Sequence, residues 1–193
     1  MLSVMMAVLL AAAGTATAAG PTETVRAAVQ QVFSQQDGPA VRTASIAERR
    51  AEIRKITERL FDFEEMSRRS LGGAWAQASP VEQQEFVRLF AGLIAAAYMG
   101  RIEQYAGEPI TYVGKQVEGA DARVQSRVVT PKGSEVGIEY RLSRGTDGRW
   151  TVYDIDVDGF SLVGSYKAQF NRLLQRGSFA DLLKQLRQKA AGS

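Results

Sequence analysis

Three aspartates alternate along one short segment, Asp154-Ile155-Asp156-Val157-Asp158-Gly159, in a spacing that could bind a metal ion. The segment imitates the opening of a calcium-binding EF-hand loop, which takes oxygen ligands at alternate positions, Gly at the sixth and a bidentate Glu at the twelfth. Here the ninth position is Leu162 and the twelfth is Ser165. A β-strand explains the alternation without a metal, because it points the aspartates outward and the residues between them inward. We therefore interpret the segment as a strand and expect no metal site.

The 193-residue chain contains no His and no Cys. A Ser-His-Asp triad, a thiolate nucleophile, a disulfide and an ordinary zinc site are therefore all excluded. Catalysis would have to use carboxylate, Lys, Tyr or Ser side chains, or a metal bound by oxygen. Phosphate-binding loops and the Gly-x-Gly-x-x-Gly motif are also missing from the sequence. These features favour binding over catalysis, and we expect neither an enzyme nor a cofactor.

Basic residues exceed acidic residues only slightly, with 24 Lys and Arg against 21 Asp and Glu, for a formal net charge of +3. This surplus is too small to indicate a dedicated nucleic-acid surface. The basic residues between 49 and 59 are interleaved with glutamates, which is typical of a solvated helix face. We expect no nucleic-acid partner.

The first 22 residues carry no charged side chain, and Leu2 to Ala13 forms an apolar run. The run has about 12 residues, whereas a membrane-spanning helix needs about 20. Ala16 and Ala18 fit the small-x-small pattern that precedes signal-peptide cleavage. We predict a cleavable signal peptide over residues 1–18, export, and a single soluble, monomeric domain over residues 19–193. A membrane anchor is the alternative interpretation.

Apolar residues at helical spacing, together with capping signals, predict helices at both ends of the mature chain. One is expected over 23–36, a second begins at the capping box of Ser45 and Glu48, and a short third helix over 61–71 ends at Gly72. The longest begins at Pro80, and its apolar stripe runs to residue 105. Two more helices are expected after Ser161 and after residue 178.

From residue 110 the apolar period changes to two, and turn signals at 118–120, 131–133 and 145–148 separate four segments. This predicts a four-stranded antiparallel sheet with one apolar face, covered on that side by helices in a single α+β domain. The residues expected on the covered face are Ala122, Val124, Ser126 and Val128; Val136, Ile138, Tyr140 and Leu142; and Thr151, Tyr153, Ile155 and Val157.

A set of short motifs occurs in a specific order and spacing: Phe61-Asp62-Phe63, Met66-Ser67-Arg68, Leu71-Gly72 and Trp75; Phe86, Phe90, Leu93 and Tyr98; and Tyr153-Asp154-Ile155, Asp158-Gly159, Ser161-Leu162-Val163, Tyr166-Lys167 and Gln169-Phe170. Together these motifs resemble the MlaC, or toluene-tolerance, family of periplasmic phospholipid-binding proteins. The resemblance covers residues 23 to 189. Two positions depart from the family pattern, Ser165 where Asn is usual and Lys167 where Arg is commoner.

The resemblance implies an NTF2-like cone with a lipid pocket, acting as a soluble carrier in the periplasm of a Gram-negative bacterium. Such a carrier encloses the acyl chains of a phospholipid. It shuttles the lipid between an outer-membrane lipoprotein complex and an inner-membrane lipid ABC transporter complex, its implied partners. A related branch lies beside genes for hopanoid synthesis, so a hopanoid or another polycyclic lipid is an alternative cargo.

We expect the lipid pocket between the sheet and the helices. Its apolar side chains have the same character as an ordinary core, so a periplasmic adaptor with a filled core stays open. A carboxylate-based enzyme on a similar scaffold is a second alternative. The residues predicted to bind lipid are Phe90, Leu93, Ile94 and Tyr98 of the long helix; Val124, Val128, Ile138, Tyr140, Tyr153 and Ile155 of the sheet; and Val163, Tyr166 and Phe170 of the following helix.

Overall fold

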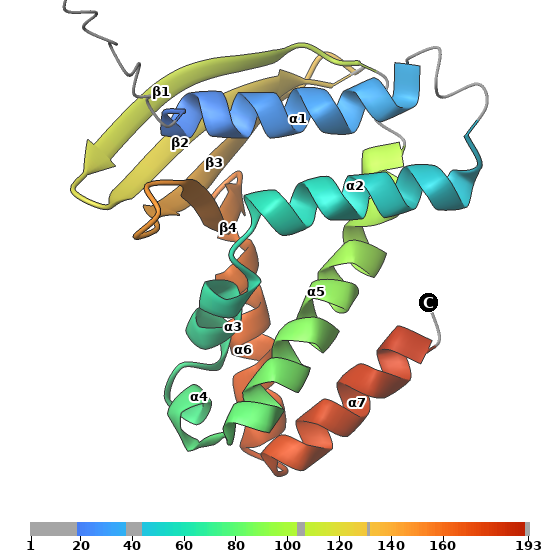
Figure 1. Cartoon of the computed structure of the whole chain (residues 1–193), viewed down its shortest axis with the longest axis vertical. Helices are drawn as coiled ribbons and strands as arrows, with labels where there is room; N and C mark the ends of the chain where they lie inside the picture. Colours follow the sequence, from blue (N-terminus) through green and yellow to red (C-terminus); the bar gives the residue numbers. More distant parts are fainter. Residues whose placement is uncertain (1–18, 38–43, 104–106, 131, 192–193) are drawn as a thin grey trace, which may run out of the picture.

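The computed structural model describes residues 19–37, 44–103, 107–130 and 132–191 (Figure 1). The predicted signal peptide over residues 1–18 lies outside them, as does the end of the predicted apolar stripe at residue 105. Within the described residues, no helix is both long and apolar enough to cross a membrane. The elements are α1 (Pro21–Asp37), α2 (Ile46–Leu60), α3 (Phe63–Leu71), α4 (Gly73–Gln77), α5 (Pro80–Glu103), β1 (Ile110–Glu118), β2 (Asp121–Val129), β3 (Glu135–Arg144), β4 (Trp150–Val157), β5 (Phe160–Ser161), α6 (Leu162–Leu174) and α7 (Phe179–Ala191).

Local side-chain caps begin several of the helices. Ser45 and Glu48 form the predicted capping box of α2, in which the backbone N–H of Ser45 donates to the Glu48 carboxylate at 2.7 Å. Ser79 and Glu82 make the same reciprocal pair before α5. Each cap satisfies backbone donors that have no partner within the helix. The short helix α4 was not predicted, because five residues give too little periodicity to identify.

The sheet is antiparallel throughout, with strand order β1-β2-β3-β4-β5, and α1 lies across one of its faces (Figure 1). The α+β class and the antiparallel sheet are confirmed. The fifth strand has two residues and follows a tight turn in which Asp158 and Gly159 both have positive φ angles, 50° and 87°. An Asp-Gly pair is well suited to such a turn, because Gly and, to a lesser extent, Asp tolerate positive φ.

One β-bulge changes which residues of β4 face the helices. Arg141 pairs with Asp154 and Leu142 pairs with Val152, so Tyr153 is an extra residue with no partner across the ladder. A bulge reverses the alternation on either side of it. The predicted placement of Thr151 and Tyr153 on the same face as Ile155 is therefore wrong.

The buried side chains form two separate cores. The helical core lies among α3, α5, α6 and α7, and the sheet core lies between the sheet, α1 and the end of α2. Phe61, between α2 and α3, packs against both, and the backbone N–H of Asp62 donates to the carbonyl of Val152 at 2.9 Å. In Figure 1 the long helices of the helical core extend away from the sheet.

Candidate functional site

The residues predicted to bind lipid fall into both cores rather than into one cluster. Tyr98 and Val128 belong to neither core. The members of the helical core are Phe90, Leu93, Ile94, Tyr153, Val163, Tyr166 and Phe170, and those of the sheet core are Val124, Ile138, Tyr140 and Ile155.

Burial divides the predicted residues more sharply than position does. Five are buried by the protein itself, namely Phe90, Val124, Tyr140, Val163 and Phe170. The other eight are only half-buried: Leu93, Ile94, Tyr98, Val128, Ile138, Tyr153, Ile155 and Tyr166. Half-buried apolar surface remains available to a ligand, whereas a closely packed core side chain has no free face. The half-buried group is the better candidate for lipid contact.

Aromatic side chains pack between α5 and α6, where the buried Phe90 and Phe170 meet the half-buried Tyr166. The ring of Phe90 lies 5.4 Å from that of Phe170 and 5.0 Å from that of Tyr166, both in T-shaped geometry. Burial raises the pKa of the Tyr166 hydroxyl, and the nearby Tyr98 adds to the effect. Tyr166 is therefore uncharged at neutral pH, and its side chain packs against the helical core.

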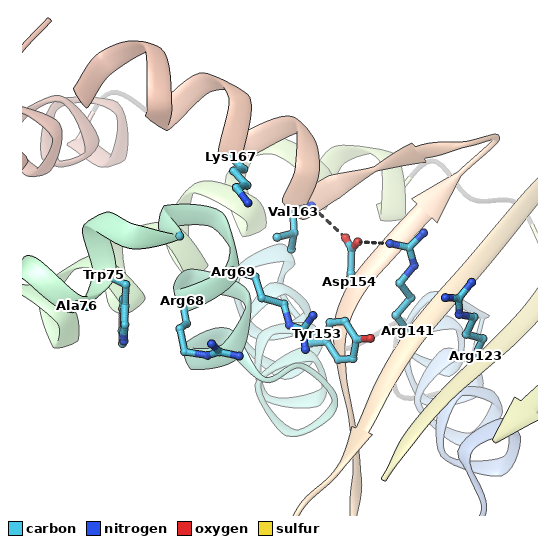
Figure 2. A pocket seen from close by; sticks show the side chains of 11 residues that line it. Arg68, Arg69, Trp75, Ala76, Arg123, Arg141, Tyr153, Asp154, Val163 and Lys167 are labelled. Atoms are coloured by element: carbon cyan, nitrogen blue, oxygen red, sulfur yellow. Dashed lines mark hydrogen bonds and ion pairs between the residues drawn. The ribbon is translucent and has the colours of Figure 1, made fainter. Parts of the chain in front are cut away.

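A cleft of about 630 Å³ opens where α3, α4, α6 and the sheet meet (Figure 2). Trp75, Tyr153, Asp154 and Val163 contribute to its wall. We call it the basic cleft, because five cationic side chains line it: Arg68, Arg69, Arg123, Arg141 and Lys167.

The two arginines of α3 share one carboxylate. Glu65 accepts hydrogen bonds from Arg68 at 2.6 Å and from Arg69 at 2.6 Å. The hydrogen bond from Arg68, helped by that from Arg69, holds the pKa of the Glu65 carboxyl below its ordinary value although partial burial opposes it. The Arg69 guanidinium also lies 3.9 Å from the centre of the Tyr153 ring, a cation-π contact that orients it.

Asp154 ties the sheet to the first turn of α6. Its carboxylate accepts from the Ser161 hydroxyl at 2.6 Å, from the Val163 backbone N–H at 3.0 Å and from Arg141 at 3.4 Å. The residue is only 4% exposed, so the sequence-based placement of Asp154 on an outward, solvated face is wrong. Desolvation alone would lower the pKa of Arg141, but the hydrogen bond to Glu139 and the charge of Asp154 together raise it.

The other two aspartates of the alternating segment also have structural partners. Asp156 accepts from the backbone N–H of Gly159 at 2.7 Å, and Asp158 accepts from that of Gly137 at 2.8 Å. In the described part of the chain, no group of three or more acidic, His or Cys side chains could hold a metal ion. The three carboxylates serve the β4–β5 turn and the start of α6.

Comparison with known proteins adds to this geometry. The family model described as MlaC protein matches residues 26–188. This chain belongs to the MlaC family. The resemblance expected from the sequence motifs is thereby confirmed.

A solved structure shares the fold of this MlaC-family chain. It is the phospholipid-binding protein from Ralstonia solanacearum, determined in complex with a phospholipid. The match has a TM-score of 0.79 and 27% sequence identity, and covers 90% of this chain and 98% of that chain. A search of the curated proteins gave no match.

Sequence reasoning did not find the basic cleft of this MlaC-family chain. Arg68 and Lys167 lie within the family motifs, but the sequence predicts no role for them or for the arginines of β2 and β3. The five cations lie on α3, α6 and two strands, so only tertiary packing brings them together. The pair Arg68-Arg69 before the helix-ending Gly72 was the one local signal.

Proposed function

We propose that this chain is a periplasmic carrier that encloses the acyl chains of a phospholipid and shuttles it between an outer-membrane lipoprotein complex and an inner-membrane lipid ABC transporter complex. The observation that carries the proposal is the shared fold, over 90% of this chain, with a protein solved in complex with a phospholipid. The proposal includes export by a signal peptide over residues 1–18 and a soluble monomer without enzymatic activity.

The half-buried apolar side chains give the proposal its physical basis. Moving each methylene of an acyl chain into water costs about 0.8 kcal/mol, so a phospholipid with roughly thirty methylenes cannot cross an aqueous compartment unprotected. Acyl chains can cover the exposed part of the half-buried apolar side chains on α5 and on the sheet. These are Leu93, Ile94 and Tyr98 on α5 and Val128, Ile138 and Ile155 on the sheet.

The first test is the content of the protein as purified. The chain is produced with its leader, purified from the periplasm without detergent, and extracted with organic solvent for mass spectrometry. We expect phospholipid masses in near-stoichiometric amount. Masses of polycyclic lipids would show that the cargo is hopanoid-like and not a phospholipid. A lipid-free extract from folded protein would refute the carrier function.

The second test uses two leucines one turn apart on α5. Leu93 is half-buried, whereas Leu89 is 9% exposed and packed in the helical core. We expect Leu93→Trp to leave the stability of the delipidated protein nearly normal while strongly reducing lipid co-purification, because the indole occupies ligand space. Leu89→Trp is the matched control and should lower the free energy of unfolding by about 1–3 kcal/mol through overpacking.

Both variants are compared after delipidation, because bound lipid itself raises apparent stability. Chemical unfolding monitored by circular dichroism measures the stability. If Leu93→Trp unfolds the protein, or leaves its lipid content unchanged, Leu93 does not line the lipid site.

A further inference from the structure

Two exposed apolar side chains flank the β4–β5 turn, on the same face of the sheet as the proposed lipid site. In the described part of the chain, no large apolar side chain is more exposed than that of Phe160, at 77%, and Val157 is 41% exposed. Phe160 pairs with Val157 across the turn, and Val157 pairs with Ile138 of β3. Residues directly opposite each other in an antiparallel ladder have their side chains on one face. Phe160 and Val157 therefore share the face of Ile138, one of the half-buried residues proposed to contact acyl chains.

Exposure rises along this row of paired residues, from the middle of the sheet to its β5 edge. The row begins at Ser126 of β2, which is 2% exposed and pairs with the half-buried Ile138. Val128 and Ile155, the other half-buried residues proposed for lipid contact on this face, lie on the two sides of the row. From Ile138 outward each position is apolar, so the surface of the lipid site continues to the edge of the sheet.

The other face of β5 is polar, which agrees with this register. Ser161, the next residue, pairs with Asp156, and its hydroxyl donates to the Asp154 carboxylate at 2.6 Å. Successive residues of a strand point to opposite faces. The polar partners of Ser161 therefore lie on one side of the sheet and the Phe160 ring on the other.

The β4–β5 turn holds the exposed ring in a fixed place. Asp158 and Gly137 of β3 exchange two hydrogen bonds: the Asp158 N–H donates to the Gly137 carbonyl at 3.0 Å, and the Asp158 carboxylate accepts from the Gly137 N–H at 2.8 Å. The Asp156 carboxylate accepts from the Gly159 N–H at 2.7 Å. Phe160 follows directly. A ligand that covers a side chain already held in place loses less conformational entropy on binding.

We propose that Phe160 and Val157 form an apolar rim of the lipid site, and that an acyl chain of the bound lipid passes across this rim at the β5 edge of the sheet. The assignment rests on the proposed carrier function. Covering the two side chains removes apolar surface of both protein and lipid from water, which is the driving term of such binding. Sequence reasoning placed neither residue in the lipid site.

The first test measures whether bound lipid covers the rim. The chain contains no Cys, so Phe160→Cys introduces a single thiol. The rate of its reaction with a charged maleimide is measured on delipidated protein and on protein loaded with phosphatidylglycerol. We expect the lipid to slow the reaction severalfold, because the acyl chain covers residue 160. Equal rates in the two forms would overturn the proposal.

The matched control for this test is Val81→Cys. Val81 is 74% exposed, close to the value for Phe160, and lies in the first turn of α5, at the end of that helix remote from Tyr98. Its thiol should react at the same rate with and without lipid. Equal slowing at both positions would show a general effect of the lipid on the reagent and overturn the proposal.

The second test measures how much the rim contributes to lipid retention. Protein loaded with phosphatidylglycerol is equilibrated with protein-free vesicles, and the lipid that remains on the protein is measured for the wild type, Phe160→Ser and Val81→Ser. We expect Phe160→Ser to shift the distribution about tenfold toward the vesicles, because the acyl chain loses its contact with the ring. Val81→Ser should retain lipid as the wild type does. Both side chains are exposed, so the fold should survive, which circular dichroism checks.

The outcomes separate the rim from the carrier function. If Phe160→Ser retains lipid as the wild type does, or if Val81→Ser loses as much lipid, the rim is wrong and only the carrier function stands. In the first of these cases Phe160 would be left as a contact for a protein partner. If the wild type itself retains no lipid, the carrier function is refuted, and the rim with it.

Discussion

The two halves of α5 carry similar apolar residues but have different surroundings. In the N-terminal half, Phe86 and Phe90 are completely buried, and their rings contact each other and Phe170. In the C-terminal half, Ile94 and Tyr98 are only half-buried. One continuous stripe therefore serves first as core and then as available surface. The first half is packed by the protein's own side chains and needs no ligand to bury it.

The apolar face of the sheet shows the same division. At one end Ala122, Leu142 and Val152 are buried against the residues of α1 and α2. At the other end Val128, Ile138 and Ile155 are half-buried. The half-buried parts of sheet and helix are where acyl chains would gain most from contact, since burial of apolar area is the driving term.

The largest expected effect is the loss of stability when a side chain in the buried half of α5 is truncated. Phe90→Ala removes a ring with three aromatic neighbours and should lower the free energy of unfolding by about 3–5 kcal/mol. Ile94→Ala, one turn further, should cost only about 1 kcal/mol, because its side chain is half-buried. Urea unfolding of delipidated protein measures both. Equal losses would mean that α5 has no such division.

A smaller effect is expected at Asp154, which holds α6 beside the half-buried part of the molecule. Asp154→Ala leaves the Ser161 hydroxyl and the Val163 N–H without their acceptor and should cost about 2–3 kcal/mol. Asp156→Ala is the control and should cost less than half as much, because the Gly159 N–H that it leaves without an acceptor lies in an exposed turn and its ion pair with Arg141 is long, at 3.6 Å. Similar losses from both variants would show that the buried carboxylate is not what secures α6.

Local signals made the helices predictable, whereas the register of the sheet and the basic cleft depend on distant pairing. The capping pairs Ser45 with Glu48 and Ser79 with Glu82 act within one turn, so sequence alone reveals them. The bulge at Tyr153 depends on how β4 pairs with β3. The alternation of residues along one strand does not predict that pairing.

The candidate lipid residues were predictable in type but not in exposure. Phe90 and Leu93 read alike on an apolar stripe, and only packing makes the first buried and the second half-buried. The grouping of the cleft cations could not be predicted from the sequence, because Lys167 and Arg69 come together only when α6 packs near α3. Ordinary surface arginines and lysines have the same appearance in sequence.

The smallest expected effect lies at the boundary between the two ends of the sheet face. Ser126 follows the buried Val124 and precedes the half-buried Val128 on the same face. Its residue exposure is 2%, and its Oγ has no hydrogen-bond partner among the described residues. A buried hydroxyl without a partner has lost its hydration without compensation, so its removal should not destabilise the folded state.

We expect Ser126→Ala to leave the free energy of unfolding unchanged or raise it by up to about 1 kcal/mol. Urea unfolding of delipidated protein measures this, with Ser165→Ala on exposed α6 surface as the control. A loss above about 1 kcal/mol would show that the hydroxyl is hydrogen-bonded in solution and that the packed end of the sheet extends beyond Val124.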